Sequence, residues 1–360
     1  MHAMRSILCV LLLGSFWAVA SDKNEAPTGE KERKFEFTYT AMIKEVPEGA
    51  KNVDLWIPVP QSSKHQKISD AKFQLRKRTE ITLKDKKGEE TAVDVEIDQK
   101  PEIKSEETYD NKIAHWKFSA DDARNLTVVM TFECKRKEAA ASDISKARAL
   151  TGSEQKDMEL WLQANKLVLV GGDFVATADA ATKGAKTPNE IAKAAYDYTV
   201  STMKYDKPKD KPGWGKGSTQ WACDSKFGNC TDFHAMIMSI GRTKGIPVKF
   251  EMGFPIPAHD AAKPETSAGP IGGYHCWAKF YLGGVGWVPV DASEAQKFAD
   301  KRDYFFGHLC ENRVQLSSGR DVNLVPKQAG EPLNYFIYPY AEADGKVLVV
   351  DKVFAFKDLN

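Results

Sequence analysis

The chain has 360 residues, of which 42% are hydrophobic and 10% aromatic, with 51 basic and 50 acidic side chains. This balance excludes disordered, collagen-like and low-complexity chains, and the length predicts about two domains that each bury a core. The formal net charge of +1 provides no overall attraction to nucleic acid or to an acidic membrane, so neither is an expected partner.

Residues 1–20 have the pattern of a secretory signal peptide. Arg5 supplies a positive flank, residues 7–13 form a short apolar core, and residues 18–20 (AVA) form a small-x-small cleavage site. The core is too short to span a bilayer, so no stable membrane anchor is expected. We therefore predict a secreted or periplasmic protein that starts near Ser21. Cleavage also removes Cys9, which leaves five cysteines, an odd number for an exported chain.

Alternating apolar residues dominate the next part of the chain. Residues 21–34 are polar and are predicted to be a linker, and residues 35–136 are predicted to form an antiparallel β-sandwich domain. Apolar positions with a period of two are typical of half-buried strands, and Pro58 and Pro60 end the second run or place it at a sheet edge. The alternating positions are Phe35, Phe37, Tyr39, Ala41 and Ile43; Val53, Leu55, Ile57 and Val59; Val93, Val95 and Ile97; Ala114, Trp116 and Phe118; and Val128, Met130 and Phe132.

Helical patterns appear after Lys135, and residues 137–360 are predicted to form the second domain. Residues 187–190 (TPNE) are a capping box with proline at the first helical position. The helix that follows is expected to bury a stripe made of Ile191, Ala194, Ala195 and Tyr198. Residues 206–220 are predicted to be a loop, and residues 344–345 (DG) predict a final hairpin in a β-rich tail.

A cysteine at a helix start is the first chemical signal. Residues 228–233 (GNCTDF) open a helix with one apolar face, and Gly245 ends it. Cys230 therefore falls in the first turn, where unpaired N–H groups and the helix dipole favour a thiolate over a thiol. The same N–H groups could stabilise an oxyanion on an acyl intermediate.

Two predicted strands supply a base and an acid. Residues 274–281 (YHCWAKFY) and 287–291 (WVPVD) are separated by a glycine turn. An antiparallel pairing places His275, near the start of one strand, where it could face Asp291 at the end of the other. An imidazole that takes the thiol proton, held by a carboxylate, is the arrangement used for nucleophilic acyl transfer.

Four sequence blocks in this order resemble the transglutaminase-like superfamily: residues 228–233, 245–247 (GIP), 275–277 (HCW) and 286–291 (GWVPVD). The resemblance covers about residues 185–300, and residues 56–60 (WIPVP) resemble the β-domain that often precedes this core. It implies an α+β fold: an antiparallel β-sandwich, then a papain-like, transglutaminase-like core with a β-rich C-terminal tail. It also implies that Cys230 is the nucleophile, His275 the base and Asp291 the orienting acid.

The superfamily includes cross-linking acyltransferases, thiol peptidases, deamidases and members without catalysis, and the complete triad favours an enzyme here. We therefore predict an exported thiol acyltransferase or hydrolase that acts on peptide or glutamine-type amides. Its partner would be a peptide or protein substrate, with cell-wall peptide among the candidates. The alternative is a non-catalytic peptide-binding or cell-wall-binding module on the same fold. No pattern indicates the oligomeric state.

The second oxyanion donor has three candidates upstream of the nucleophile: Trp214, Gln220 and Trp221. A packing role is at least as expected for each of them. No cofactor is expected, and no calcium loop of the EF-hand type occurs. A zinc site made from Cys223, Cys230 and His275 is disfavoured, because a cysteine spacing of seven matches no close metal pair.

The remaining cysteines predict disulfides. Cys276 follows His275 on a strand and must point to the opposite face, so it is not expected to be a second nucleophile. We expect one disulfide between Cys223 and Cys276 and another between Cys134 and Cys310, across the two domains. These bonds would leave Cys230 as the free thiol that explains the odd count.

Overall fold

The computed structural model describes residues 31–82, 90–260 and 263–359. The predicted signal peptide lies outside these residues, and so do residues 21–30 of the predicted linker. Strand β1 begins at Glu32, so the last residues of the predicted linker are already part of a sheet. Secondary structure is mixed and the strands pair mostly antiparallel, which confirms the α+β class.

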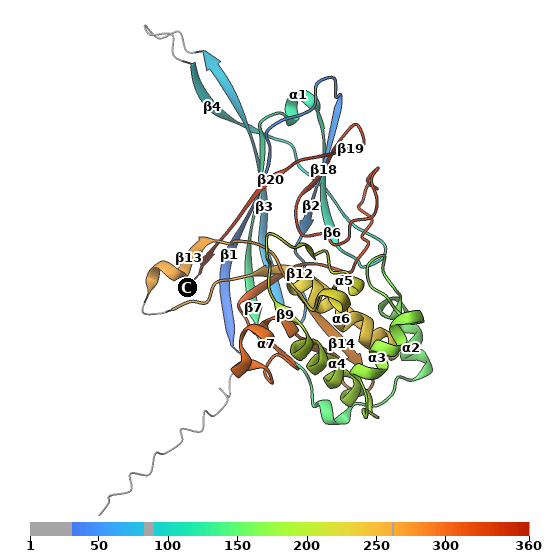
Figure 1. Ribbon diagram of the computed structural model, residues 1–360. Coiled ribbons are helices and arrows are strands. Elements are labelled where there is room, and N and C mark those ends of the chain that lie inside the picture. The colour runs from blue at the N-terminus through green and yellow to red at the C-terminus, as the bar shows by residue number, and fades with distance from the viewer. Residues whose placement is uncertain (1–30, 83–89, 261–262, 360) are drawn as a thin grey trace, which may run out of the picture. The chain divides into compact units, whose positions relative to one another are not determined.

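Two antiparallel sheets are formed by the alternating runs together with strands from the end of the chain (Figure 1). The first has the order β13-β20-β1-β7-β3-β4 and the second β19-β18-β2-β6-β5. Their apolar faces share one core that includes Phe37, Leu55, Trp116 and Met130. The strands are β1 (Glu32–Ile43), β2 (Asn52–Val59), β3 (Gln66–Thr82), β4 (Glu90–Ile97), β5 (Glu102–Ser105), β6 (Lys112–Ser119), β7 (Leu126–Lys137), β13 (Ala268–Pro270), β18 (Tyr340–Ala343), β19 (Lys346–Leu348) and β20 (Asp351–Asp358).

One run of predicted strand residues differs from expectation. The side chains of Val93 and Val95 are 38% and 46% exposed, although their alternation suggested a buried face. β4 pairs with β3 at the edge of its sheet, and this pair extends away from the shared core (Figure 1). The pattern therefore predicted the strand correctly but not its burial, because burial depends on a second layer that does not reach this ribbon.

The C-terminal strands complete the N-terminal sheets. β20 pairs with β1 over eight residues, from Phe35 opposite Asp358 to Met42 opposite Asp351. β18 and β19 form the predicted hairpin, and its turn residues Asp344 and Gly345 have φ of 46° and 78°, as a two-residue turn of type I′ requires. Residues 31–360 form one compact unit. The division into domains at residue 136, the end region of β7, stays a prediction.

A second layer positions the candidate site. A four-stranded antiparallel sheet has the order β15-β14-β12-β17, and helix α6 packs against β14 and β12. The strands are β12 (Val248–Pro255), β14 (His275–Leu282), β15 (Gly286–Val290) and β17 (Arg313–Ser318); the surrounding helices are α3 (Val175–Ala181), α4 (Pro188–Thr202), α5 (Thr219–Ser225), α6 (Cys230–Thr243) and α7 (Ala292–Lys297).

Short elements connect these layers. They are the helices α1 (Ala120–Ala123) and α2 (Gly152–Asp157), the 3-10 turns η1 (Ile144–Lys146), η2 (Glu159–Leu162), η3 (Gly172–Phe174), η4 (Pro264–Ser267) and η5 (Ala299–Lys301), and the strands β8 (Ala139–Ala140), β9 (Lys204–Tyr205), β10 (Pro212–Gly215), β11 (Phe227–Gly228) and β16 (His308–Leu309). The predicted loop at residues 206–220 thus contains one short strand and the start of α5.

The capping box predicts the start of α4 correctly, and the helix begins at Pro188 after the cap Thr187. The buried face is shifted from the predicted stripe, however. It consists of Ala192, Ala195, Tyr196, Thr199 and Val200. The side chain of Tyr196 is directed inward because its hydroxyl donates to the Arg302 carbonyl oxygen at 2.7 Å.

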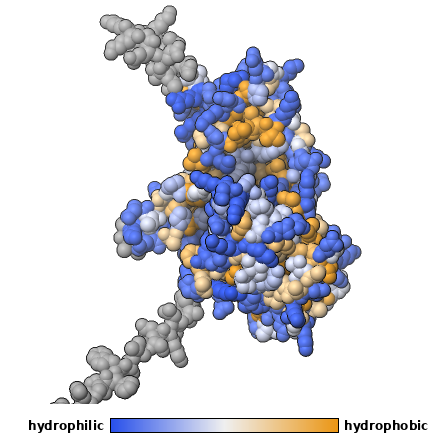
Figure 2. All heavy atoms as spheres, viewed as in Figure 1, coloured by the Kyte–Doolittle hydropathy of each residue, from blue (hydrophilic) through white to orange (hydrophobic). Residues whose placement is uncertain are grey.

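Figure 2 shows apolar side chains gathered in the upper part of the view, where Figure 1 places β18 and β19. Val347 and Val349 are 69% and 81% exposed.

In the part of the chain that the structure describes, no helix is long and apolar enough to cross a membrane.

Candidate active site

The start of α6 holds Cys230 in place through a reciprocal cap. Asn229 accepts the Thr231 N–H on its side-chain oxygen at 2.9 Å, and its own N–H donates to Asp232 Oδ2 at 3.0 Å. Cys230 is therefore the first residue of the helix and lies at the positive end of the helix dipole. Its side chain is only 2% exposed, because α6 is buried along nearly all of its length.

Asp232 also anchors the loop that precedes the nucleophile. Its carboxylate accepts the N–H groups of Gly215 at 2.6 Å and Gly217 at 2.9 Å, in addition to that of Asn229. Gly217 has a φ of 62°, a conformation that L side chains rarely adopt. The carboxylate therefore ties the 213–217 segment to the first turn of α6.

Replacing Asp232 with alanine is expected to lower the free energy of unfolding by about 3 kcal/mol, since three buried N–H donors lose their acceptor. Urea denaturation measures this loss. Asp224→Ala is the matched control, because Asp224 contacts the exposed amide of Gln220 on α5. Equal stability of the two variants would contradict the anchoring role of Asp232.

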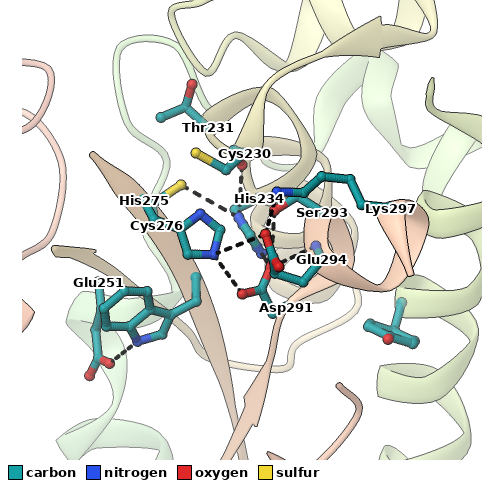
Figure 3. Close-up of polar contacts among 12 residues, drawn as sticks. Cys230, Thr231, His234, Glu251, His275, Cys276, Asp291, Ser293, Glu294 and Lys297 are labelled. Carbon is teal, nitrogen blue, oxygen red and sulfur yellow. Dashed lines mark hydrogen bonds and ion pairs between the residues drawn. The ribbon is translucent and has the colours of Figure 1, made fainter. Parts of the chain in front are cut away.

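His275 and Asp291 meet as the strand register predicted. His275 opens β14 and Asp291 follows β15, and the two strands pair in antiparallel register. His275 Nε2 lies 2.7 Å from Asp291 Oδ2 (Figure 3). Because Nε2 is taken by the carboxylate, Nδ1 remains for Cys230, which is one of the groups that raise the pKa of His275.

Two further buried side chains, His234 and Cys276, lie beside Cys230. His234, one turn after Cys230, lies with Nδ1 2.7 Å from the Cys230 carbonyl oxygen, and a carbonyl can only accept, so this nitrogen carries the proton. Cys276 Sγ lies 3.5 Å from the same nitrogen (Figure 3). His275 and Trp277 share one face of β14 and Cys276 takes the other, which faces α6. The alternation of the strand was thus predicted, but not the contact of Cys276 with the site.

Electrostatics favour a thiolate and an imidazolium. Burial disfavours the charged form of Cys230, but hydrogen bonds from Cys276 and His275 and the charge of His275 lower its pKa well below the usual value. Burial likewise opposes protonation of His275, but Asp291 and Cys230 together raise its pKa to about 10. Burial raises the pKa of Cys276, and the neighbouring Cys230 raises it further. The Cys276 thiol therefore stays neutral beside Cys230.

The three candidate oxyanion donors have partners elsewhere. Trp214 Nε1 donates to the Pro208 carbonyl at 3.0 Å, and Trp221 Nε1 to the Phe227 carbonyl at 3.2 Å. Gln220 is exposed and its amide donates to Asp224. These contacts give local packing roles to all three side chains and provide no support for a second oxyanion donor among them.

Neither expected disulfide is present. Cys134, Cys223, Cys230, Cys276 and Cys310 are all free thiols. Cys276 does not pair with Cys223 because its sulfur is directed toward His234 and Cys230 on the buried side of β14. Cys310 contacts Arg313 Nη2 at 3.5 Å instead of Cys134. The odd count of cysteines therefore does not single out Cys230, which differs from the other four by its surroundings alone.

Two tyrosines that sequence reasoning missed contact the segments that precede Cys230. The Tyr274 hydroxyl accepts from the Asn229 side-chain amide at 2.9 Å, and the Tyr335 hydroxyl donates to the Gly215 carbonyl at 3.2 Å. The two rings are 5.5 Å apart. Tyr274 directly precedes His275 and could have been suspected from that position. Tyr335 lies in the C-terminal tail, where no motif pointed to it.

Across residues 31–82, 90–260 and 263–359, no three His, Cys, Asp or Glu side chains are placed to hold a metal ion.

Comparison with known proteins adds family information. Residues 175–292 match the model of the transglutaminase-like superfamily. The chain is 25% identical to an uncharacterized protein of Haemophilus influenzae, over 96% of this chain and 95% of that protein. It is similar in fold to the crystal structure of a candidate cysteine protease from Cytophaga hutchinsonii, with a TM-score of 0.55 and 12% identity over 92% of each chain. The periplasmic domain of TgpA from Pseudomonas aeruginosa matches with a TM-score of 0.34 and 12% identity, over 74% of this chain and 90% of that domain.

Proposed function

From the transglutaminase-like domain that this chain contains over residues 175–292, we propose that the protein is an exported thiol acyltransferase or hydrolase. It acts on peptide or glutamine-type amides. Cys230 is the nucleophile, His275 the general base and acid, and Asp291 the residue that orients the imidazole. The acceptor of the acyl group is water in a peptidase or amidase reaction, or an amine in a transglutaminase reaction.

The reaction follows from the positions of these groups. The Cys230 sulfur attacks the amide carbon, and the electron pair of the carbonyl moves to its oxygen, where the N-terminus of α6 stabilises the charge. The His275 imidazolium gives its proton to the nitrogen as the C–N bond breaks, which leaves a thioester and a free amine. Water or an amine, deprotonated by the now neutral His275, then attacks the thioester and restores the Cys230 thiolate.

One observation carries this proposal: a buried thiol at a helix N-terminus lies beside an imidazole whose other nitrogen is held by a buried carboxylate at 2.7 Å. A binding module has no need of this arrangement, because three buried ionisable groups cost free energy unless they are paired. Their arrangement therefore supports catalysis over simple binding.

A groove beside the site supports a peptide substrate. A cavity of about 460 Å³ is lined by residues 270–273, Tyr338 and part of β20. The Tyr338 hydroxyl accepts the Tyr274 N–H at 3.4 Å, so the groove leads to the residue that precedes His275. An extended peptide in this groove would direct an amide toward the covered nucleophile once Tyr274 moves.

Export belongs to the same proposal. It is supported by the signal-peptide pattern of residues 1–20, and it predicts that the mature chain begins near Ser21. N-terminal sequencing of the protein recovered from outside the cytoplasm tests this. An intact N-terminus on that material would contradict cleavage.

Alkylation of the cysteines tests the proposal without knowledge of the substrate. The rate of reaction of Cys230 with iodoacetamide is measured against pH by mass spectrometry. We expect Cys230 to react as a thiolate at pH values far below the pKa of free cysteine, which is about 8.5. We also expect a second transition near pH 10, where His275 loses its proton. The buried thiols of Cys134 and Cys276 have raised pKa values and serve as internal references. A single transition at or above about 8.5 for Cys230 would favour the binding module.

A further inference from the structure

The two oxygens of Asp291 have different partners. Oδ1 accepts from Ser293 Oγ at 3.0 Å and from the Glu294 N–H at 3.1 Å, which are local contacts at the start of α7. Oδ2 lies 2.7 Å from His275 Nε2 and accepts from Arg313 Nη1 at 3.1 Å. The imidazole and a guanidinium therefore share one oxygen atom of the orienting acid.

Arg313 is fixed on its other sides as well. It opens β17 opposite Pro255 of β12 and is only 2% exposed. Its guanidinium carbon lies 4.8 Å from the centre of the Trp277 ring, and Nη2 contacts Cys310 Sγ at 3.5 Å. The Trp277 indole is in turn held by Glu251 at 2.6 Å. A guanidinium keeps its proton at any physiological pH, so Arg313 is a permanent charge in a fixed place.

We propose that Arg313 is a positioning residue of the Cys230–His275–Asp291 site, which holds Asp291 Oδ2 toward the imidazole and sets the pH range in which the thiolate–imidazolium pair exists. This inference rests on the proposed function. Arg313 acts through Asp291, so this role requires no contact between Arg313 and the substrate.

The physical effect of Arg313 has a definite sign. A fixed positive charge beside the site makes it costlier to add a proton to the imidazole or to the thiolate. Arg313 also offsets part of the negative charge of Asp291, which would otherwise act on His275 alone. Without it, both Cys230 and His275 would bind protons more tightly, and the whole pH profile would move toward alkaline pH.

The other titratable or charged groups near His275 remain in place when Arg313 is changed, so they cannot produce this shift. His234 faces the site from α6 and Glu294 from α7, where Glu294 Oε1 lies 3.9 Å from His275 Nε2 and is paired with Lys297. Further groups are Cys276 on β14, Tyr205 on β9, Tyr274 before β14, Tyr196 on α4, Asp232 on α6 and Tyr335 in the C-terminal tail.

The test compares the pH dependence of Cys230 alkylation by iodoacetamide in the wild type and in Arg313→Gln, Arg313→Met and Arg313→Lys. In the two neutral variants, both transitions are expected to move up by about one pH unit, so that alkylation on the rising limb slows about tenfold. Arg313→Lys keeps the charge and is expected to keep the wild-type transitions. Arg313→Met packs on Trp277 without a polar group, so it provides a neutral variant if Arg313→Gln does not fold.

Arg242→Gln is the matched control. Arg242 is also a buried arginine, 6% exposed, and donates to the Gln163 carbonyl at 2.6 Å. It lies twelve positions after Cys230 on α6, about 18 Å along the helix. Its loss should lower stability, as seen by circular dichroism during heating, and leave both transitions unmoved.

The outcomes separate the two proposals. Wild-type transitions in folded Arg313→Gln or Arg313→Met would overturn the role of Arg313, as would an Arg313→Lys shift equal to theirs. A wild-type protein in which Cys230 titrates as an ordinary thiol would instead contradict the proposed function itself.

Discussion

Cys230→Ala is expected to abolish amide turnover, with a loss of about 10⁶-fold in kcat, because no other group can form the thioester. The substitution removes one sulfur atom from the first turn of α6 and leaves the Asn229–Asp232 cap intact, so the fold should be retained. Release of ammonia or an amine from a glutamine-containing peptide measures turnover. An amine acceptor added to the same assay distinguishes transfer from hydrolysis.

Cys223→Ala is the matched control for this substitution. Cys223 is half-buried on α5, and burial raises its pKa, so it is not a nucleophile at neutral pH. Its removal should leave turnover and probe labelling unchanged. Labelling by an electrophilic glutamine probe that persists in Cys230→Ala, or that disappears in Cys223→Ala, would contradict the assignment of Cys230.

Asp291→Asn is expected to lower kcat by about 10⁴-fold, since the amide no longer holds His275 as the imidazolium and presents a donor as well as an acceptor to Nε2. The variant also leaves the buried Arg313 guanidinium without its carboxylate, which costs about 3 to 5 kcal/mol of stability. Turnover measures the first effect and urea denaturation the second. Turnover within tenfold of wild type in a folded variant would rule out the orienting role.

The stability effect of Asp291→Asn should depend on pH with a predictable sign. His275 has a pKa raised to about 10, so its pairing contributes fully below its unfolded pKa of about 6.5, and the contribution declines as the pH rises from there to about 10. Asp291 has a strongly lowered pKa, because burial is outweighed by His275 and Arg313, so its contribution is lost only in acid. The difference from wild type should therefore be largest between about pH 4 and about pH 6.5 and should shrink steadily up to about pH 10.

Asp54→Asn provides a matched carboxylate–histidine control. Asp54 Oδ1 lies 2.8 Å from His115 Nε2 in the N-terminal sheets, a contact comparable with that of Asp291 and His275. The aspartate is partly exposed, so the change should cost little stability. Turnover should be unaffected, which would separate the loss of an orienting acid from the general loss of an ion pair.

Local patterns predicted the elements that carry the candidate site. The cap residues at positions 187–190 and 228–233 marked the starts of α4 and α6, since each helix start requires acceptors for its free N–H groups. The order of β14 and β15 placed His275 near Asp291 because an antiparallel turn fixes the register. Each of these signals is contained in a short stretch of the chain, which is why sequence alone reveals it.

Long-range contacts were beyond sequence reasoning. Arg313 reaches Asp291 only because β17 joins the far side of β12, a pairing that no local pattern specifies. The same limit explains the failed disulfide pairing, which assumed that Cys276 faced Cys223. Val93 and Val95 alternate like core residues but lie on a projecting ribbon. In each case the missing information was which second layer covers a strand.

The pairing of β20 with β1 has a kinetic consequence. Their residues are more than 300 positions apart, so β1 keeps an open hydrogen-bonding edge until almost the whole chain has been synthesised. Closing such a long loop is slow, and an unpaired strand edge attracts other chains while it waits. The incomplete chain is therefore exposed to aggregation, and the pairing of β20 with β1 is the step that covers this edge.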